Sequence, residues 1–274
     1  MSYFNVLGLS KEPFSSSPDP EFFFESNEHK AALTRLLIEI RLRRGLCVIL
    51  GDVGTGKTTL SRKLFQMLGE RPDMLFYMIM DPTFHSEELF LESLIRAFGL
   101  EYELGKEKSI LDYKEAIKRF LYQKGVEENK TIVLVVDEAQ KLNSLSLEIL
   151  RVLLNYETNE FKLLQLVIFG QMELLPRIKE IKNFVDRIVL KYVLNPLDED
   201  ETRDLIEFRL RHAGFESGHA LFTPDAIGEI HKYSHGYPRR INLLCHNALR
   251  SLISDNKVVV DGGMIRELVA RGLN

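Results

Sequence analysis

The sequence has 274 residues, of which 45% are hydrophobic and 28% charged, and its formal net charge is −4 at pH 7. This composition is that of a soluble globular protein, and the length is sufficient for one α/β domain followed by a smaller domain. The charge is mildly negative, so the protein as a whole has no field that would recruit polyanions.

The sequence also argues against a membrane-spanning or exported protein. No apolar stretch approaches the ~20 residues needed to span a bilayer, and the first five residues lack the basic and apolar regions of a signal peptide. The two cysteines, Cys47 and Cys245, lie on apolar stretches and are interpreted as small core residues. Together these features predict a protein of the reducing cytoplasm.

The first 25 residues form an irregular segment in which prolines and serines alternate with aromatic residues. Because this segment is too apolar for a disordered tail, we expect it to pack along the main domain. A helix is predicted over residues 26–43, since apolar residues recur there at helical spacing. Arg41, Arg43 and Arg44 are expected at its solvated carboxyl end, where basic side chains complement the helix dipole.

A phosphate-binding loop (P-loop) follows the first predicted strand, residues 46–50. The loop reads Gly51-Asp52-Val53-Gly54-Thr55-Gly56-Lys57-Thr58, and a predicted helix follows from Thr59 to residue 68. Glycines let the backbone curl so that its N–H groups point at phosphate oxygens, and the positive end of the helix dipole faces the same anion. Lys57 is predicted to bridge the β- and γ-phosphates of a nucleotide, and the Thr58 hydroxyl to ligate Mg²⁺. The nucleotide-binding segment is therefore predicted from Gly51 to Thr59.

Two acidic residues supply the second half of this site. Residues 132–136 form a continuous, β-branched apolar run, as expected for a strand buried on both faces of a parallel sheet. The run ends in Asp137 and Glu138, at the sheet edge where ligands bind in open α/β folds. We assign Asp137 to Mg²⁺ coordination and Glu138 to orienting and polarising the attacking water. Together with the P-loop, this pair predicts a nucleoside triphosphatase.

Strands and helices alternate up to about residue 194. Further strands are predicted over residues 74–80, 163–169 and 188–194, and helices over 86–98, 109–124 and from 143 or 144 onward. This alternation predicts an α/β fold of the P-loop NTPase type, with helices on both faces of a parallel sheet. After residue 196 only helices are predicted, over residues 198–213, 224–233, 238–254 and 263–270. We therefore predict an α/β domain over residues 1–196 and a small helical lid domain over 197–274.

This architecture resembles that of the AAA+ ATPases. In that family a polar residue on the strand beyond the acidic pair senses the γ-phosphate, and Gln171 has the matching position; an ordinary polar strand end is the alternative interpretation. The segment Gly236-Tyr237-Pro238-Arg239-Arg240-Ile241-Asn242 resembles the second sensor at the start of a lid helix. The resemblance implies that Arg239 reaches the nucleotide phosphates, with Arg240 as the alternative.

The same resemblance implies an arginine that a neighbouring subunit supplies to the active site. Arg187, just before the last predicted strand, has the matching position, and Arg177 is the second candidate. A surface ion pair of Arg187 with Asp186 or Glu180 is an equally compatible interpretation. The implied active site is complete only at the interface of an ATP-dependent, hexamer-like oligomer.

Motifs along the whole chain resemble, more narrowly, the general-secretion-pathway protein A family of bacterial AAA+ ATPases. They are Phe4-Asn5-Val6-Leu7-Gly8-Leu9, Pro13-Phe14, Pro18-Asp19-Pro20-Glu21-Phe22, the P-loop, Asp137-Glu138-Ala139-Gln140, Ile168-Phe169-Gly170-Gln171, Asn195-Pro196-Leu197 and Pro238-Arg239-Arg240-Ile241-Asn242. The family assists the assembly of type II secretion or type IV pilus-like machines at the inner membrane. The resemblance implies ATP and Mg²⁺ as cofactors and an inner-membrane secretion or pilus assembly protein as partner. Longer members carry a transmembrane helix and a peptidoglycan-binding domain after the ATPase, whereas this sequence ends after the lid. We therefore expect a cytoplasmic protein that reaches the inner membrane through a partner.

Three other interpretations compete with this one. A DNA-associated AAA+ ATPase of the transposition-helper type would gather basic residues on one face of an oligomer: Arg41, Arg43, Arg44, Arg62 and Lys63. The mild net acidity disfavours that function, because binding to the DNA backbone needs a concentrated basic surface. A nucleotide-dependent scaffold that switches with little turnover is also compatible with the motifs. His231, His235 and His246 are metal-ligand candidates, but no cysteine or acid completes a recognisable set.

Overall fold

The structure is a computed structural model that describes residues 3–15, 20–100, 109–216 and 220–272. The chain divides into two compact units. The α/β unit comprises His29–Asp52 and Leu60–Leu194, and the helical unit comprises Met1–Glu28, Val53–Thr59 and Asn195–Asn274. The last passage of the chain from one unit to the other, at residues 194 and 195, lies close to the predicted domain boundary.

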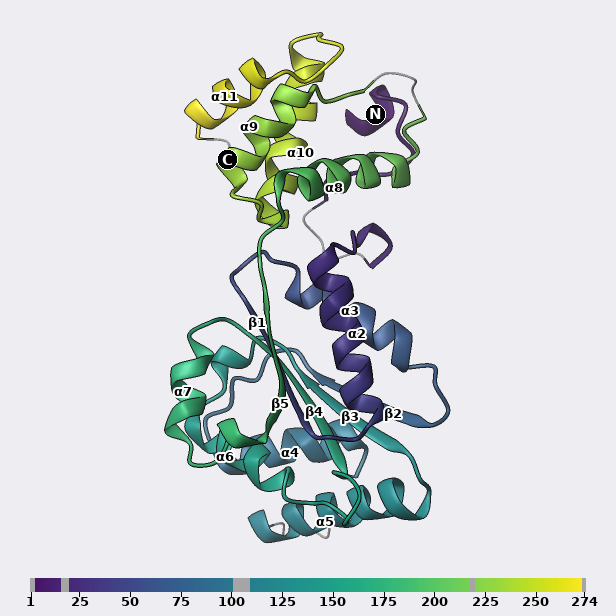
Figure 1. Ribbon diagram of the computed structural model, residues 1–274, viewed down its shortest axis with the longest axis vertical. Coiled ribbons are helices and arrows are strands. Elements are labelled where there is room, and N and C mark those ends of the chain that lie inside the picture. The colour runs from purple at the N-terminus through teal and green to yellow at the C-terminus, as the bar shows by residue number, and fades with distance from the viewer. Residues whose placement is uncertain (1–2, 16–19, 101–108, 217–219, 273–274) are drawn as a thin grey trace. The chain divides into compact units, whose positions relative to one another are not determined.

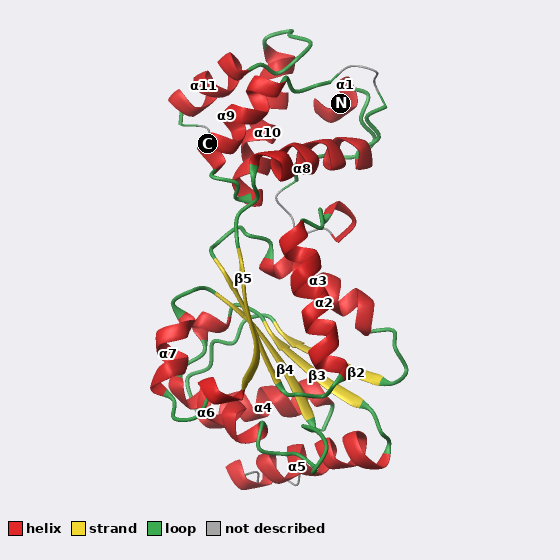
Figure 2. Ribbon diagram, in the orientation of Figure 1, coloured by secondary structure: helices red, strands yellow, loops and turns green. Residues whose placement is uncertain are grey.

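A single five-stranded parallel sheet forms the centre of the α/β unit (Figure 2). Its strands are β1 (Leu46–Gly51), β2 (Met74–Ile79), β3 (Thr131–Val136), β4 (Leu164–Gly170) and β5 (Ile188–Leu194). They lie in the order β2-β3-β4-β1-β5, and every neighbouring pair is parallel. The predicted parallel sheet is thereby confirmed, and β1, β3 and β4, which lead into the candidate site, occupy its three inner positions.

The burial of the strands explains why their sequences are continuous apolar runs. Every residue of β1, β3 and β4 is buried, whereas the edge strands β2 and β5 are partly exposed. Side chains on one face of the inner strands, such as Val48 and Leu134, belong to one core with the helices from α4 to α7. The alternate residues, among them Cys47 and Val135, are buried as well. Both faces are therefore covered, as expected for a parallel sheet.

The helices of the α/β unit lie on both sides of the sheet. They are α2 (Asn27–Arg41), α3 (Lys57–Leu68), α4 (Glu87–Phe98), α5 (Ile110–Tyr122), α6 (Ser144–Leu153) and α7 (Leu174–Glu180). Short helical turns η3 (Gln123–Glu127), η4 (Ala139–Lys141) and η5 (Val185–Arg187) complete the unit. In Figure 1, α2 and α3 lie together on one side of the sheet, and α4, α5 and α6 lie on the other. Side-chain caps at Ser86, Ser109 and Asn143 determine where α4, α5 and α6 begin.

Arg43 differs from the expected solvated end of a helix. Helix α2 ends at Arg41, and Arg43 has a left-handed backbone with φ of 50°. Its guanidinium donates to Thr131 Oγ1 at 3.0 Å and to the carbonyl oxygens of Gly125 and Asn129 at 3.3 and 2.9 Å. It also lies 4.6 Å from the centre of the Phe161 ring, and its partial burial lowers the pKa of Arg43. Arg43 therefore links the start of β1 to the start of β3 and is not part of a free basic surface.

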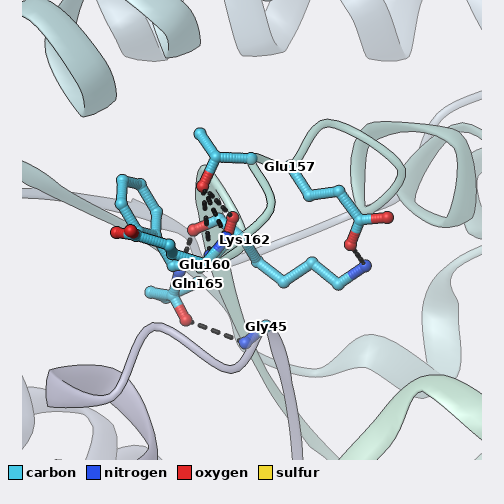
Figure 3. Close-up of polar contacts among 7 residues, drawn as sticks. Gly45, Glu157, Glu160, Lys162 and Gln165 are labelled. Carbon is cyan, nitrogen blue, oxygen red and sulfur yellow. Dashed lines mark hydrogen bonds and ion pairs between the residues drawn. The ribbon is translucent and has the colours of Figure 1, made fainter.

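Gln165 organises the loops at the amino end of β4 (Figure 3). Its side-chain oxygen accepts from the N–H of Gly45 at 2.8 Å, and its side-chain nitrogen donates to the carbonyl of Lys162 at 2.8 Å. Lys162 in turn pairs with Glu157 across the turn before β4. The buried amide thus satisfies two backbone groups where β1 and β4 begin, at the edge of the sheet opposite to the carboxyl ends of the strands.

The helical unit contains α1 (Tyr3–Val6), η1 (Pro20–Phe22), α8 (Glu199–His212), α9 (Pro224–Ser234), α10 (Pro238–Ser254) and α11 (Gly262–Ala270). The helices predicted after residue 196 are present. The irregular amino-terminal segment was expected along the α/β domain, but its described residues, 3–15 and 20–25, belong to the helical unit instead. Phe14 is buried in that core, and its ring lies edge-on to the Phe222 ring with 6.0 Å between the ring centres. The Arg209 guanidinium donates to the carbonyl of Pro13 at 3.1 Å. Aromatic residues of this segment therefore serve the core formed by α8 to α11.

Both cysteines are buried, as their apolar surroundings predict. Cys47 lies in β1 and Cys245 in α10, and burial raises the pKa of the Cys47 thiol to about 12 and raises the pKa of Cys245 as well. At pH 8 only about one Cys47 thiol in ten thousand would be the reactive thiolate. We expect neither thiol of the native protein to react with Ellman's reagent on the minute scale, and both to react after unfolding in guanidinium chloride. Rapid reaction of the native protein would contradict this packing.

Candidate nucleotide-binding site

The P-loop has the backbone conformation that its glycines predict. Strand β1 ends at Gly51 and helix α3 begins at Lys57, so the loop connects a buried strand directly to a helix amino terminus. Gly54 and Gly56 have φ values of 88° and 94°, in the left-handed region that favours glycine. Thr55 and Lys57 are buried. A strand, a glycine turn and a helix start in this order are the structural context that a phosphate-binding loop requires.

The start of α10 lies against this loop within the helical unit. The N–H of Arg239 donates to the carbonyl of Gly54 at 3.4 Å. A Cβ atom on Gly54 would lie 3.0 Å from Cβ of Arg239, so the close approach itself favours glycine. Arg239 is exposed beside the loop, whereas the Arg240 guanidinium lies 5.2 Å from the centre of the Tyr237 ring. Of the two candidate arginines, Arg239 is therefore the one whose backbone contacts the P-loop.

A second close approach holds the start of α10 in place. Gly236 has φ of 73°, and a Cβ atom there would lie 2.0 Å from the carbonyl oxygen of Leu197. The Gly236 carbonyl accepts from the N–H of Leu197 at 2.9 Å. Two motifs far apart in the sequence, around Leu197 and around Pro238, are thus in direct contact. Only glycine fits at this contact without displacing the backbone.

Asp137 and Glu138 stand at the carboxyl end of β3, as predicted. Asp137 is 1% exposed; its Oδ1 accepts from the N–H of Glu138 at 2.9 Å, and its Oδ2 accepts from Ser61 Oγ at 3.4 Å. The N–H of Asp137 donates to the carbonyl of Ile79 at the end of β2, at 2.9 Å. Because Ser61 lies on α3, one helical turn after Thr58, Asp137 is connected to the helix that begins in the P-loop.

Glu138 has an unusual backbone conformation. Its φ and ψ are 51° and 35°, in the left-handed region that costs a residue other than glycine about 1–3 kcal/mol. The residue is half-buried, and its Oε2 accepts from Gln140 Nε2 at 2.6 Å. Strained residues of this kind gather at functional sites, where the surrounding structure holds them in place. This strain is a feature that the sequence did not reveal.

Gln171 follows β4 directly and is half-buried at the same edge of the sheet. Its N–H donates to Gln140 Oε1 at 3.2 Å. β3 and β4 are neighbours in the sheet, so Gln171 stands at the same sheet edge as Asp137 and Glu138. The role of Gln171 toward a phosphate remains a prediction.

The two candidates for the trans-acting arginine differ in their surroundings. Arg177 on α7 donates to the carbonyl oxygens of Gln140 and Leu142, so its guanidinium is engaged within its own subunit. Arg187 is half-buried and forms no ion pair with Asp186 or Glu180 within the described part of the chain. Its buried Nε has no hydrogen-bond partner among the described residues. Arg187 is therefore the better candidate for contact with a neighbouring subunit.

Two of the three histidines considered as metal ligands have other polar neighbours. The Thr202 hydroxyl is 3.1 Å from His231 Nδ1, and His246 Nδ1 is 3.1 Å both from the Tyr3 hydroxyl and from Glu12 Oε1. Across residues 3–15, 20–100, 109–216 and 220–272, no group of three or more His, Cys, Asp or Glu side chains is arranged to hold a metal ion.

Comparison with known sequences decides the family. Residues 40–178 match the AAA domain, a span that covers β1 to β4, the P-loop and the acidic pair. The chain belongs to the AAA domain family. Over 249 residues it is 36% identical to General secretion pathway protein A of Aeromonas hydrophila, which confirms the resemblance seen in its motifs. The alignment covers 90% of this chain and 44% of that protein, so the chain spans less than half the length of this relative.

Solved structures show the same fold at low sequence identity. The AAA domain protein matches Cdc6p from Pyrobaculum aerophilum with a TM-score of 0.69 and 16% identity, covering 92% of this chain and 69% of the other. It matches the Aeropyrum pernix ORC1 protein in complex with DNA with a TM-score of 0.64 and 18% identity, covering 95% and 69%. The RuvB Holliday junction branch migration motor of Thermotoga maritima gives a TM-score of 0.55 at 14% identity, covering 87% and 67%. Across the described residues, no helix of this chain is both long and apolar enough to cross a membrane.

Proposed function

We propose that this AAA domain protein binds and hydrolyses ATP and serves as an assembly or energising factor for a bacterial type II secretion or type IV pilus-like system. One observation carries the enzymatic part of the proposal. The buried Asp137 and the strained Glu138 stand together after β3, and Ser61 connects Asp137 to the helix that begins in the P-loop. In this arrangement Asp137 can serve as a metal ligand, and the neighbouring Glu138 remains available to act on a water molecule.

The proposed reaction transfers the γ-phosphoryl group of ATP to water. The water oxygen attacks the γ-phosphorus, the bond to the bridging oxygen breaks, and ADP and phosphate leave. Glu138 accepts the proton that the water loses, and Gln171 hydrogen-bonds to the attacking water or the γ-phosphate. Lys57, together with the N–H groups of the loop from Gly51 to Thr59, neutralises and holds the phosphates.

Mg²⁺ would supply charge neutralisation at the β- and γ-phosphates, and Thr58 and Asp137 are the residues that would hold it. Asp137 fits this role because its carboxylate is buried and already accepts from Glu138 N–H and Ser61 Oγ, which fix its direction. At the start of α10, Arg239 would neutralise part of the phosphate charge. A lid that holds phosphate through one arginine can change its contacts after hydrolysis.

The proposed client rests on the relative from Aeromonas hydrophila, whose name places it in the general secretion pathway. The match covers 90% of this chain, well beyond the P-loop and the acidic pair. We propose accordingly that the protein works in the cytoplasm, that it self-associates into a hexamer-like oligomer with ATP, and that an inner-membrane assembly protein is its partner.

The DNA-associated function has less support. The ORC1 protein of Aeropyrum pernix forms a complex with DNA, but at 18% identity that similarity shows the fold alone. Of the basic residues proposed for a DNA-binding face, Arg43 is engaged with Gly125, Asn129 and Thr131. Arg44 lies 3.6 Å from Glu39. The net charge of −4 further disfavours binding to a phosphate backbone.

The experiment that separates the two clients measures ATP hydrolysis per subunit against protein concentration, with and without duplex DNA at physiological salt. A rate that rises with concentration and ignores DNA supports a self-assembling ATPase of the secretion type. Strong stimulation by DNA would contradict the proposed client, and would assign the protein to the DNA-associated class. Nucleotide binding without turnover under every condition would instead indicate a switching scaffold.

We predict that Arg187→Ala leaves ATP affinity within about twofold and removes the activity gained on oligomerisation. Arginine fingers contribute about 10³–10⁵ in kcat, so a loss of at least about 100-fold at high protein concentration is expected. Arg96→Ala is a matched control, because Arg96 pairs with Glu92 on the surface of α4. Mixing Arg187→Ala with Glu138→Gln should restore part of the activity. In a mixed oligomer, an Arg187→Ala subunit can supply Glu138 and a neighbouring Glu138→Gln subunit can supply Arg187 to the same active site. A loss of ATP binding, or no recovery on mixing, would place Arg187 outside a trans active site.

A further inference from the structure

The side chain of Gln140 connects the ends of two neighbouring strands. Its Nε2 donates to Glu138 Oε2 at 2.6 Å, after β3, and its Oε1 accepts from the N–H of Gln171 at 3.2 Å, after β4. A carboxylate can only accept and an N–H can only donate, so the two partners determine which way the amide faces. We infer that Gln140 is a positioning residue that sets the direction of the Glu138 carboxylate and ties it to the end of β4.

The backbone of Gln140 is fixed from two sides. The Arg177 guanidinium donates to the carbonyl oxygens of Gln140 and Leu142, so α7 holds the turn η4. A Cβ atom on Gly170 would lie 2.7 Å from Leu174 Cδ2 and 3.7 Å from the N–H nitrogen of Gln140. The end of β4 therefore packs closely on the segment that carries Gln140. Because the backbone of Gln140 is fixed in this way, its side chain can hold the Glu138 carboxylate in one position.

The Glu138 carboxylate depends on Gln140 for its direction, because the local backbone of Glu138 does not fix it. The residue is in the left-handed region, and its side chain makes no capping hydrogen bond to η4. Within the described part of the chain, the contact to Gln140 is the side-chain hydrogen bond that holds its carboxylate. That contact uses Oε2, so Oε1 is the oxygen that would accept from a water molecule. A general base must point at the proton it takes, and a small misplacement costs a large part of the rate.

This inference rests on the proposed ATP hydrolysis, and two substitutions test it. Gln140→Met keeps the length of the side chain and removes both hydrogen bonds. Gln140→Glu keeps an acceptor for the N–H of Gln171 but places a second carboxylate against Glu138. If Gln140 acts through Glu138, both variants lose kcat by about tenfold or more, while KM for ATP and the Kd of a non-hydrolysable analogue stay within about twofold. If the link to Gln171 alone mattered, Gln140→Glu would keep the wild-type kcat.

Gln165→Met is the matched control. Gln165 also bridges two backbone segments with its amide (Figure 3), and it lies at the end of β4 opposite to Gln171. We expect this control to lower the melting temperature at least as much as Gln140→Met and to keep the kcat of the folded enzyme. The contrast separates loss of stability from loss of positioning, because a purely structural Gln140 would behave like Gln165.

A second measurement tests whether the effect passes through Glu138. In single-turnover reactions, the Gln140→Met substitution should slow ATP hydrolysis when it is made in the wild-type protein. Added to Glu138→Gln in a double variant, it should lower the rate further by less than about twofold, since the two residues act as one unit. The inference would be overturned if the double variant lost rate by the product of the two single losses, or if Gln140→Met kept the wild-type kcat. The proposed function would still stand in either case. If the wild-type protein itself hydrolyses no ATP in the same assay, the proposed function fails, and the inference that rests on it fails too.

Discussion

Glu138→Gln is expected to bind ATP with wild-type affinity, within about twofold, and to hydrolyse it at least about 100-fold more slowly. The amide is nearly isosteric with the carboxylate but cannot accept the proton of the attacking water, and general bases contribute about 10²–10⁴ in rate. The binding contacts of the P-loop are unchanged. Phosphate release and equilibrium binding of a fluorescent ATP analogue, measured on the same preparation, give the two quantities.

A matched control for this prediction is Glu160→Gln, which makes the same chemical change in an exposed turn before β4. This variant should equal the wild type in both assays. Undiminished hydrolysis by Glu138→Gln would show that Glu138 is not the general base. Loss of ATP binding would show that the residue contributes to the binding site or to the fold of this edge, where its strained backbone already makes it unusual.

Lys57→Ala is expected to weaken ATP binding by at least about 100-fold, equivalent to about 2.7 kcal/mol. The ammonium group is proposed to contact the β- and γ-phosphates, and no other loop residue from Gly51 to Thr58 carries a positive charge that would replace it. Helix α3 should survive the substitution, because alanine has the highest helix propensity. The measurement is isothermal titration with Mg-ATP, together with circular dichroism to verify the fold.

Lys118→Ala serves as the control for Lys57→Ala, since Lys118 is an exposed lysine of α5. It should bind ATP like the wild type. A wild-type Kd for Lys57→Ala would contradict the assignment of residues 51–58 as a phosphate-binding loop. Weakened binding in both variants would indicate a general effect of charge instead of a specific contact.

The sheet and the P-loop could be predicted because their signals are local. β1, β3 and β4 are buried on both faces, and such strands are apolar at nearly every position, which makes them unbroken runs in the sequence. The glycines at 54 and 56 indicate backbone angles that other residues avoid. Asp137 and Glu138 follow one of the buried strands directly, so the sheet topology places them at the ligand-binding edge.

The surroundings of Arg43 and the position of the amino-terminal segment were not predicted correctly, because they depend on contacts between residues far apart in the chain. Arg43 has the sequence context of a basic helix end, but its partners at Gly125, Asn129 and Thr131 follow more than eighty residues later. The amino-terminal segment has aromatic residues that any apolar surface would accept, and nothing in their spacing says that Phe14 packs on Phe222. Hydrophobic burial is non-directional, so composition predicts that such residues are buried but not where.

Gln140 was visible in the sequence but its role was not. It stands two residues after Glu138, in a motif that indicated the family and no more. Its importance appears only when β4 is placed beside β3, because that pairing brings the N–H of Gln171 to its side-chain oxygen. A polar residue two positions after the proposed general base would be the signal to search for in related sequences. Ser61 is a similar case, since its hydroxyl reaches Asp137 from α3.

The most direct test of the proposed catalysis is phosphate release from Mg-ATP by the wild-type protein, Glu138→Gln and Lys57→Ala, measured side by side at one high protein concentration with parallel binding of ATP. Turnover by the wild type, binding without turnover by Glu138→Gln, and neither binding nor turnover by Lys57→Ala is the predicted result. Equal phosphate release by all three proteins would contradict the proposed site.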